Sequence, residues 1–192
     1  MDKPTENTRQ KFIQTASRLF RLQGYHGTGI NQIIKESGAP KGSLYYHFPG
    51  GKEQLAAEAV ETNAAFVGEL LDRHLSGAES PAEAVEALIE EMAKHFPEDR
   101  GGLGIPIASV ALETALTSSR LREACVQAYA GFEQRFAEKL RQAGREDEQA
   151  RLLGAAVNAL IEGACLVSFA KGNADPLRAA KAAVRLMLDS TS

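Results

Sequence analysis

The sequence predicts an all-α protein of about nine helices, arranged as a small N-terminal domain and a larger C-terminal domain. Apolar residues recur at steps of three and four along most of the 192-residue chain, which is the period of an amphipathic helix. Glycine and proline interrupt this pattern between successive helices, and no stretch alternates as a β-strand does. We place the boundary so that the domains are residues 1–51 and 52–192.

Three short helices are expected in the N-terminal domain. The segment from Thr8 to Gln23 places its apolar residues on one stripe, and Gly24 ends it because glycine accepts the left-handed conformation that closes a helix. A second helix begins near Ile30 and stops at Gly38. The third runs from Lys41 to Phe48, directly after a proline that is tolerated in a first turn.

The C-terminal domain begins with a long helix, from Lys52 to about Leu75, that we interpret as a connector. The next helix reaches about Phe96 and starts at Ser80, which is expected to cap it, with Glu83 in the position of a capping box. The glycine-rich and proline-rich residues 97–106 predict a loop. Four more helices are expected: Ile107–Leu116, Ser119–Ala143, Glu146–Ala170 and Asp175–Leu188.

The charge of the chain is divided unevenly. Residues 1–52 hold eight basic and three acidic side chains, whereas the remainder holds fourteen basic and twenty-two acidic ones. A basic N-terminal part suits a protein that presents one end to a polyanion, because phosphate neutralisation dominates nucleic-acid affinity. Chance clustering of charge is the alternative.

The two short helices that meet at Gly38 predict a helix-turn-helix, in which the second helix enters the DNA major groove. Leu44 and Phe48 are four residues apart and are expected to face the core, which leaves the polar and aromatic residues of this helix outside. We expect phosphate or base contacts from Thr28, Lys41, Gly42, Ser43, Tyr45, Tyr46, His47 and Lys52. Among these, Gly42, Ser43 and Tyr46 are the candidates for base edges, with Asn31 or Gln32 as helpers. His47 either contacts a phosphate or caps its own helix.

These residues resemble the TetR family of regulators. The resemblance rests on Gly24, Tyr25, Thr28, Ile33, Gly38, the run from Lys41 to Phe48 and Lys52, Glu53 and Leu55, and it covers residues 8–60. It implies a ligand-responsive repressor that binds a near-palindromic double-stranded DNA operator as a homodimer. One departure is Gly29, where the family commonly has a hydroxyl residue that caps the second helix.

A second resemblance concerns the C-terminal domain. Gly50-Gly51 and the segment 104–113 are similar to the subgroup of lincomycin-resistance and flavonoid-responsive repressors. That subgroup often has cysteine where this chain has Ile105, so a role for that thiol does not transfer.

The last two helices, about 146–189, carry wide apolar faces rich in small residues. They are expected either to form an ordinary core pair or to provide the homodimer interface. The effector, a small apolar or aromatic molecule, is expected to contact Met92, Phe96, Leu103, Ile107, Val110, Tyr129, Phe132, Phe136 and Phe169. Most of these are also plausible core residues. Glu113, Asn158 and Glu162 lie in apolar stretches and are expected to orient the ligand, to be solvated or to pair with an arginine such as Arg122 or Arg151.

No constellation of catalytic residues is evident, and we expect neither an enzyme nor a cofactor. Glu91, His95 and His74 are a weak metal candidate whose ordinary meaning is a solvated helical face. Cys125 and Cys165 are expected to be buried core residues rather than a redox sensor. The competing class is a helical small-molecule-binding protein without DNA-binding activity.

A cytoplasmic location is expected. The first eleven residues are polar where a signal peptide needs an apolar segment, and no apolar run reaches the length that a membrane span needs.

Overall fold

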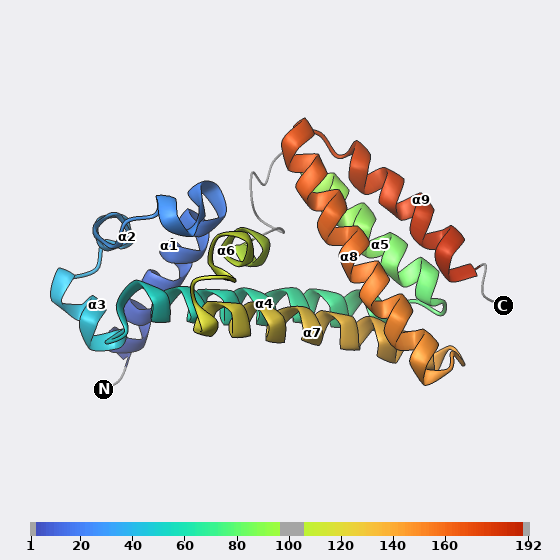
Figure 1. Cartoon of the computed structure of the whole chain (residues 1–192), viewed down its shortest axis with the longest axis horizontal. Helices are drawn as coiled ribbons and strands as arrows, with labels where there is room; N and C mark the ends of the chain where they lie inside the picture. Colours follow the sequence, from blue (N-terminus) through green and yellow to red (C-terminus); the bar gives the residue numbers. More distant parts are fainter. Residues whose placement is uncertain (1–2, 97–105, 190–192) are drawn as a thin grey trace. The chain divides into compact units, whose positions relative to one another are not determined.

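The computed structural model describes residues 3–96 and 106–189, and within these it consists of nine helices and no strand (Figure 1). The all-α prediction is confirmed, and each expected helix is present with ends that differ by a few residues. The predicted loop 97–106 lies outside the described residues except for its last one. The helices are α1 (Lys3–Gly27), α2 (Ile30–Ser37), α3 (Lys41–His47), α4 (Gly51–Gly77), α5 (Pro81–His95), α6 (Pro106–Thr114), α7 (Ser119–Gln142), α8 (Asp147–Lys171) and α9 (Asp175–Asp189).

Helix α1 differs most from its prediction. It begins at Lys3, five residues earlier than expected, and helical turns continue after Gly24 as far as Gly27. The backbone of Gly24 is nevertheless not helical, with φ 76° and ψ 172°, so α1 is two helical segments joined by a kink. Glycine interrupts the helix at the predicted position, but a short segment resumes beyond it.

The described chain forms two compact units. Unit 1 contains α1, α2, α3, α6, the part of α4 up to Ala65 and the part of α7 up to Ala128. Unit 2 contains the rest of α4 and α7 together with α5, α8 and α9. This division differs from the predicted boundary after residue 51, because α6 packs along α1 and therefore belongs with the N-terminal helices.

The core of unit 1 forms where α1 meets the two short helices. Phe12, Ile33, Leu44 and Phe48 are all fully buried. The rings of Phe12 and Phe48 meet edge to face with centroids 6.2 Å apart, an arrangement that aromatic pairs favour. These contacts fix α3 against α1 through its inward residues and leave its outer side uncovered within unit 1.

In unit 2, helix α9 packs against both α5 and α8. Its residues Leu177, Val184 and Leu188 are buried and lie on one side of the helix. Two ion pairs add to this packing at the rim: Lys181 Nζ lies 2.9 Å from a carboxylate oxygen of Glu90, and Arg185 forms a similar contact on α5.

Helix α5 begins at the cap that the sequence predicts. The Ser80 hydroxyl accepts a hydrogen bond of 3.1 Å from the backbone N–H of Glu83, and Pro81 occupies the first turn. Replacing Ser80 with alanine removes the acceptor, so we expect the free energy of unfolding to fall by about 1 kcal/mol. Chemical denaturation followed by circular dichroism measures this. Ser80→Thr keeps a hydroxyl and is expected to lose much less; equal losses in both variants would show that the cap contributes little.

Helix α8 corrects one expectation. Over an 18-residue window its mean hydropathy is 1.8, so by length and composition alone this one helix among the described residues could cross a membrane. The expectation that no apolar stretch reaches this length is corrected to this extent: alanine, leucine, isoleucine and valine raise the average of the window, although Asn158 and Glu162 interrupt it. A core helix passes the same test, and Val157 and Ile161 of α8 are buried within unit 2.

Candidate nucleic-acid interface and effector region

The helix-turn-helix is formed by α2 and α3. Gly38 ends α2 in the left-handed conformation, with φ 64° and ψ 13°, and Pro40 precedes the first residue of α3. The Ser37 hydroxyl accepts a hydrogen bond from the backbone N–H of Ala39, which satisfies one donor of the turn. Gly29, at the start of α2, provides no side-chain cap, as its departure from the family pattern implies.

Helix α3 separates inward and outward residues as predicted. Leu44 and Phe48 are buried, whereas Tyr45 and Tyr46 are 54% and 75% exposed. Lys41 is exposed and forms no ion pair among the described residues. A methyl group built on Gly42 would meet no atom within 4 Å, so packing within the protein does not require glycine there.

Ser43 and His47 are half-buried. The Ser43 hydroxyl donates a hydrogen bond of 2.6 Å to the backbone carbonyl of Pro40 and keeps its acceptor lone pairs. The His47 ring meets the Tyr46 ring edge to face with centroids 5.1 Å apart, and His47 forms no side-chain hydrogen bond to the described protein. The described structure shows a ring contact for His47 and no hydrogen bond that caps its helix, which favours the phosphate contact over the cap.

Thr28 does not lie where the sequence predicts it. Its side chain is fully buried, and its hydroxyl donates a hydrogen bond of 2.7 Å to the Gly24 carbonyl and lies 3.3 Å from Gln23 Nε2. The predicted phosphate contact would require this hydroxyl to leave the Gly24 carbonyl that it now satisfies at the kink of α1.

Lys52 is also less available than predicted. Its ammonium group lies 4.2 Å from the centroid of the Tyr25 ring, a cation–π contact, and the side chain is half-buried. Burial lowers the pKa of Lys52, an effect that the carboxylate of Glu113 partly offsets. Lys52 thus has an interaction within unit 1 that a phosphate contact would have to replace.

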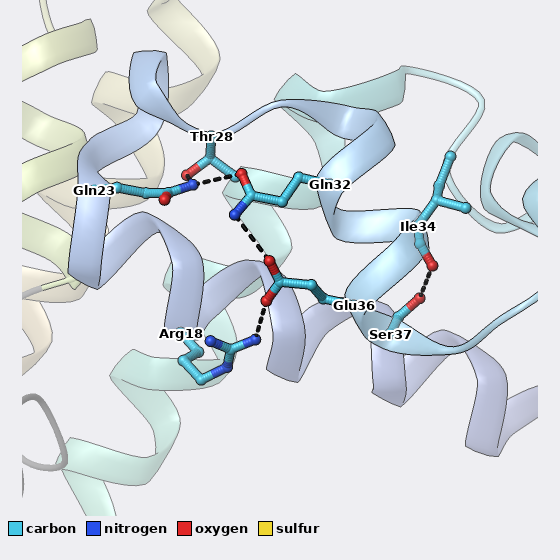
Figure 2. A network of polar contacts seen from close by, with 7 residues as sticks. All are labelled: Arg18, Gln23, Thr28, Gln32, Ile34, Glu36 and Ser37. Atoms are coloured by element: carbon cyan, nitrogen blue, oxygen red, sulfur yellow. Dashed lines mark hydrogen bonds and ion pairs between the residues drawn. The ribbon is translucent and has the colours of Figure 1, made fainter.

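A chain of polar contacts joins α1 to α2 (Figure 2). Gln23 donates a hydrogen bond of 2.7 Å to Gln32, which in turn donates one of 2.9 Å to Glu36, and Arg18 pairs with the other carboxylate oxygen at 2.6 Å. The hydrogen bond from Arg18, followed by that from Gln32, holds the pKa of Glu36 below its ordinary value. Gln32 is therefore engaged in this chain, whereas Asn31 is exposed.

Glu113 on α6 reaches the kink in α1. Its carboxylate accepts a hydrogen bond of 2.6 Å from the backbone N–H of His26, and its backbone carbonyl lies 3.3 Å from the His26 ring nitrogen. A methyl group at Gly24 would lie 1.9 Å from this carboxylate. Glu113 was expected to orient a ligand, to be solvated or to pair with an arginine, whereas its carboxylate accepts a hydrogen bond from the backbone of α1. No local pattern could have revealed this contact, because the two residues are 87 positions apart.

The residues proposed for effector binding fall in both units. Ile107 and Val110 are buried in unit 1, and Leu103 lies outside the described residues. The other six lie in unit 2: Met92, Phe96, Tyr129, Phe132, Phe136 and Phe169. Their rings form two edge-to-face pairs, Phe96 with Phe169 at 5.3 Å and Tyr129 with Phe132 at 6.3 Å between centroids.

A buried carboxyl group adjoins the second of these pairs. Glu162 on α8 receives a hydrogen bond from the Tyr129 hydroxyl, and burial raises the pKa of Glu162 to about 6. Its Oε2 atom is shielded from solvent and has no hydrogen-bond partner among the described residues. Asn158, one turn earlier on the same helix, is also buried. Both residues were predicted as polar groups in an apolar stretch, and both are inside unit 2.

Both cysteine thiols are buried, and His74 of the predicted metal candidate pairs with Glu91. Burial raises the pKa of Cys125 to about 11 and, with the nearby Glu162 carboxylate, that of Cys165 to about 12, so neither forms a thiolate readily. His74 lies 2.8 Å from a carboxylate oxygen of Glu91. In the described part of the chain, no group of three His, Cys, Asp or Glu side chains could hold a metal ion.

Helices α8 and α9 present a groove between small residues. Its volume is about 670 Å³, and its lining includes Ala159, Leu160, Gly163, Val167, Ala179 and Ala183. Two leucines of the same helices are exposed, Leu152 of α8 at 66% and Leu186 of α9 at 70%. An apolar face of this kind on two adjacent helices is typical of a subunit interface.

Comparison with known proteins supports the interpretation of both parts. Residues 12–59 match the family of bacterial regulatory proteins named for tetR, and residues 81–183 match the C-terminal domain of the LmrA/YxaF-like transcriptional regulators. The chain is 47% identical over 171 residues to the HTH-type transcriptional regulator LmrA of Bacillus subtilis strain 168, covering 89% of this chain and 91% of that protein. It is 44% identical to the HTH-type regulator YxaF of the same strain, covering 89% and 90%.

Solved structures show the same fold. The reduced form of E. coli NemR superposes with a TM-score of 0.81 at 22% identity, covering 92% of this chain and 94% of that one. SCO4454, a TetR-family regulator from Streptomyces coelicolor, gives 0.84 at 19% identity, covering 97% of each chain. With the helix-turn-helix of α2 and α3, these matches establish that the chain belongs to the TetR family of helix-turn-helix transcriptional regulators, in the group with an LmrA/YxaF-like C-terminal domain.

Proposed function

We propose that this regulator is a cytoplasmic repressor that binds a near-palindromic DNA operator as a homodimer. A small apolar or aromatic effector that binds in the C-terminal part releases it from the operator. The TetR family membership supports DNA binding over the alternative of a ligand-binding protein that has lost it.

The exposed face of α3 is the observation that carries the proposal. Two neighbouring tyrosines, Tyr45 and Tyr46, project from a helix whose inward residues are buried. Large aromatic side chains are seldom left in solvent without a partner. Each offers a hydroxyl for phosphate and a ring for a thymine methyl group, while Lys41 offers an exposed positive charge. Gly42 leaves open space into which a nucleic-acid backbone could approach.

We assign phosphate contacts to Lys41, Tyr45 and His47, and base contacts to Gly42, Ser43 and Tyr46. Ser43 retains the capacity to accept a hydrogen bond from a base, and Asn31 is an exposed helper on α2. Lys52 is a weaker candidate because its ammonium group already contacts Tyr25.

Dimerisation is proposed through α8 and α9. Small residues line the groove and allow close approach of helices, and a second copy would cover exposed leucines of α8 and α9. A two-fold dimer carries two copies of α3, which matches two half-sites about 34 Å apart in the DNA.

Effector release requires that the two parts of the chain communicate. Helix α4 is continuous from unit 1 into unit 2. We propose that effector binding among the aromatic residues of unit 2 changes the tilt of α4, and with it the separation of the two copies of α3. A repressor with altered separation no longer fits both half-sites.

Selection of bound DNA from a random-sequence pool, followed by mobility-shift titration at two salt concentrations, tests the proposal. We expect a near-palindromic site with salt-sensitive affinity. Lys41→Ala is expected to weaken binding and to reduce the slope of log affinity against log salt by about 1 per protomer, because it removes one phosphate contact. Tyr46→Ala is expected to relax the preferred sequence as well.

Lys94→Ala is the matched control, since it removes one exposed positive charge from α5 in unit 2. It is expected to leave both affinity and salt slope unchanged. Equal losses in Lys41→Ala and Lys94→Ala would point to a non-specific charge effect, and no enrichment of any sequence by a folded dimer would favour the ligand-binding alternative.

A further inference from the structure

The turn between α3 and α4 follows the proposed DNA-reading helix, and two of its backbone donors are engaged within the protein. The N–H group of Gly51 donates a hydrogen bond of 2.8 Å to the Phe48 carbonyl. That of Gly50 donates one of 2.9 Å to the Gln54 side chain. The ammonium group of Lys52, the next cation along the chain, is in a cation–π contact. A cation from another part of the chain is therefore the better ligand for a phosphate beside this turn.

Arg120 of α7 brings a positive charge to this turn. A methyl group built on Gly50 would lie 3.3 Å from Arg120 Nη1, so the guanidinium group lies beside the turn. Both residues belong to unit 1. The Arg120 side chain is exposed and forms no ion pair or hydrogen bond with the residues that the structure describes. Its charge is therefore available to a ligand outside the protein.

The backbone of Arg120 is held by its neighbours in the sequence. The first turns of α4 and α7 lie close together (Figure 1), and the Ser118 hydroxyl joins them with a hydrogen bond of 2.5 Å to the Glu53 carboxylate. The same hydroxyl accepts a hydrogen bond of 3.1 Å from the backbone N–H of Leu121, whose side chain is fully buried. Arg120 thus projects from a fixed backbone, which lowers the entropy that a phosphate contact would cost.

The two glycines of the turn have different reasons to be glycine. Gly51 has φ 64°, a left-handed conformation that favours glycine, whereas Gly50 has no positive φ. A methyl group on Gly50 would nevertheless be crowded, because it would lie 3.1 Å from Gln54 Cβ and 3.3 Å from Arg120 Nη1. Gly50 therefore leaves space beside which the guanidinium group of Arg120 can lie.

We propose that Arg120 is a further DNA ligand, whose guanidinium group contacts an operator phosphate next to the turn between α3 and α4. This inference rests on the proposed operator binding and adds to it a residue from α7. Guanidinium groups suit phosphates because their N–H donors match two oxygen atoms at once. Arg120 provides the contact that the sequence predicts for Lys52, whose ammonium group is engaged with Tyr25.

The position of Arg120 in the sequence hides this role. It belongs to the acidic remainder of the chain, in which twenty-two acidic residues outnumber fourteen basic ones. Unit 1 nevertheless includes Pro106–Ala128, so the fold adds this arginine to the basic N-terminal helices. Phosphate neutralisation depends on where charges lie in space, and the charge of unit 1 is the relevant one.

The affinity for selected operator DNA at several salt concentrations tests the proposal. Arg120→Ala is expected to weaken binding about threefold to tenfold at low salt and to reduce the slope of log affinity against log salt by about 1 per protomer, because one phosphate contact is lost. Arg122→Ala is the matched control. It removes an exposed arginine two residues later, which the helix turns to another side of α7, and it is expected to change neither quantity.

Arg120→Lys keeps the charge but loses the two-oxygen geometry. It is expected to keep the wild-type salt slope and to lose only part of the affinity. Circular dichroism, thermal unfolding and size-exclusion chromatography establish that each variant keeps the fold and the oligomeric state of the wild type.

A neutral methylphosphonate, placed in turn at each backbone position of the operator, locates the contact. At one position in each half-site, this substitution is expected to weaken binding by the wild type and to leave binding by Arg120→Ala unchanged, because both changes remove the same interaction. If Arg120→Ala acted only by disturbing the packing of α7, its loss would be the same at every position.

The proposal is overturned if Arg120→Ala keeps the wild-type salt slope, if Arg122→Ala loses as much, or if no methylphosphonate position removes the difference between the wild type and Arg120→Ala. A wild-type protein that selects no DNA would contradict the proposed function and this contact together. Sequence-specific binding that Arg120→Ala leaves unchanged would contradict the contact alone.

Discussion

Replacing Gly24 with alanine is expected to lower the free energy of unfolding by about 3 kcal/mol or more. The backbone of Gly24 has φ 76° and ψ 172°, a region that is populated almost only by glycine. The added methyl group would also lie 1.9 Å from the Glu113 carboxylate, which must then move and release its hydrogen bond to the backbone N–H of His26. Denaturant unfolding followed by circular dichroism measures the loss.

A double-mutant cycle separates the two causes. Glu113→Ala alone loses the hydrogen bond and is expected to destabilise the protein by about 1 to 2 kcal/mol. Added to Gly24→Ala, it is expected to cost little more, because that variant has already displaced the carboxylate. The remaining destabilisation measures backbone strain at the kink. An unchanged unfolding midpoint in Gly24→Ala would contradict both the conformation and the contact.

The helices could be predicted from the sequence because each is encoded locally. The apolar period locates α5 and α8, and specific residues mark the ends, such as Ser80 at the start of α5 and Gly38 at the end of α2. The outward face of α3 followed from the same period, since burial of Leu44 and Phe48 leaves Tyr45 and Tyr46 outside. The contacts of these residues with DNA stay a prediction.

Contacts between distant parts of the chain could not be predicted in the same way. The membership of α6 in unit 1 depends on its packing against α1, and no local pattern records which helix an apolar face will meet. Thr28 is a local case: its hydroxyl bonds to the Gly24 carbonyl only four residues away, but the kink at Gly24 that makes this contact is not marked by the apolar period of the helix. Sequence identified polar residues in apolar stretches, but only the structure distinguishes Glu113, bonded to the backbone of α1, from Glu162, buried in unit 2.

Glu162→Gln is expected to stabilise the protein above about pH 7 and to have little effect near pH 4. Burial raises the pKa of Glu162 from 4.5 to about 6, which means that the folded state binds the proton more tightly than the unfolded state does. Stability contributed by this group therefore falls as the pH rises from about 4 to 7, and above that range the buried carboxylate costs about 2 kcal/mol. Glutamine carries no charge and escapes this cost.

The free energy of unfolding of both proteins, measured by urea denaturation at intervals from pH 4 to pH 8, gives the difference as a function of pH. Glu90→Gln is a matched control of opposite sign, because the hydrogen bond from Lys181 lowers the pKa of Glu90. That variant is expected to be less stable than the wild type at neutral pH, and its deficit is expected to shrink as the pH falls through the lowered pKa. A pH-independent difference for Glu162→Gln would mean that its carboxyl group is not desolvated in the folded protein.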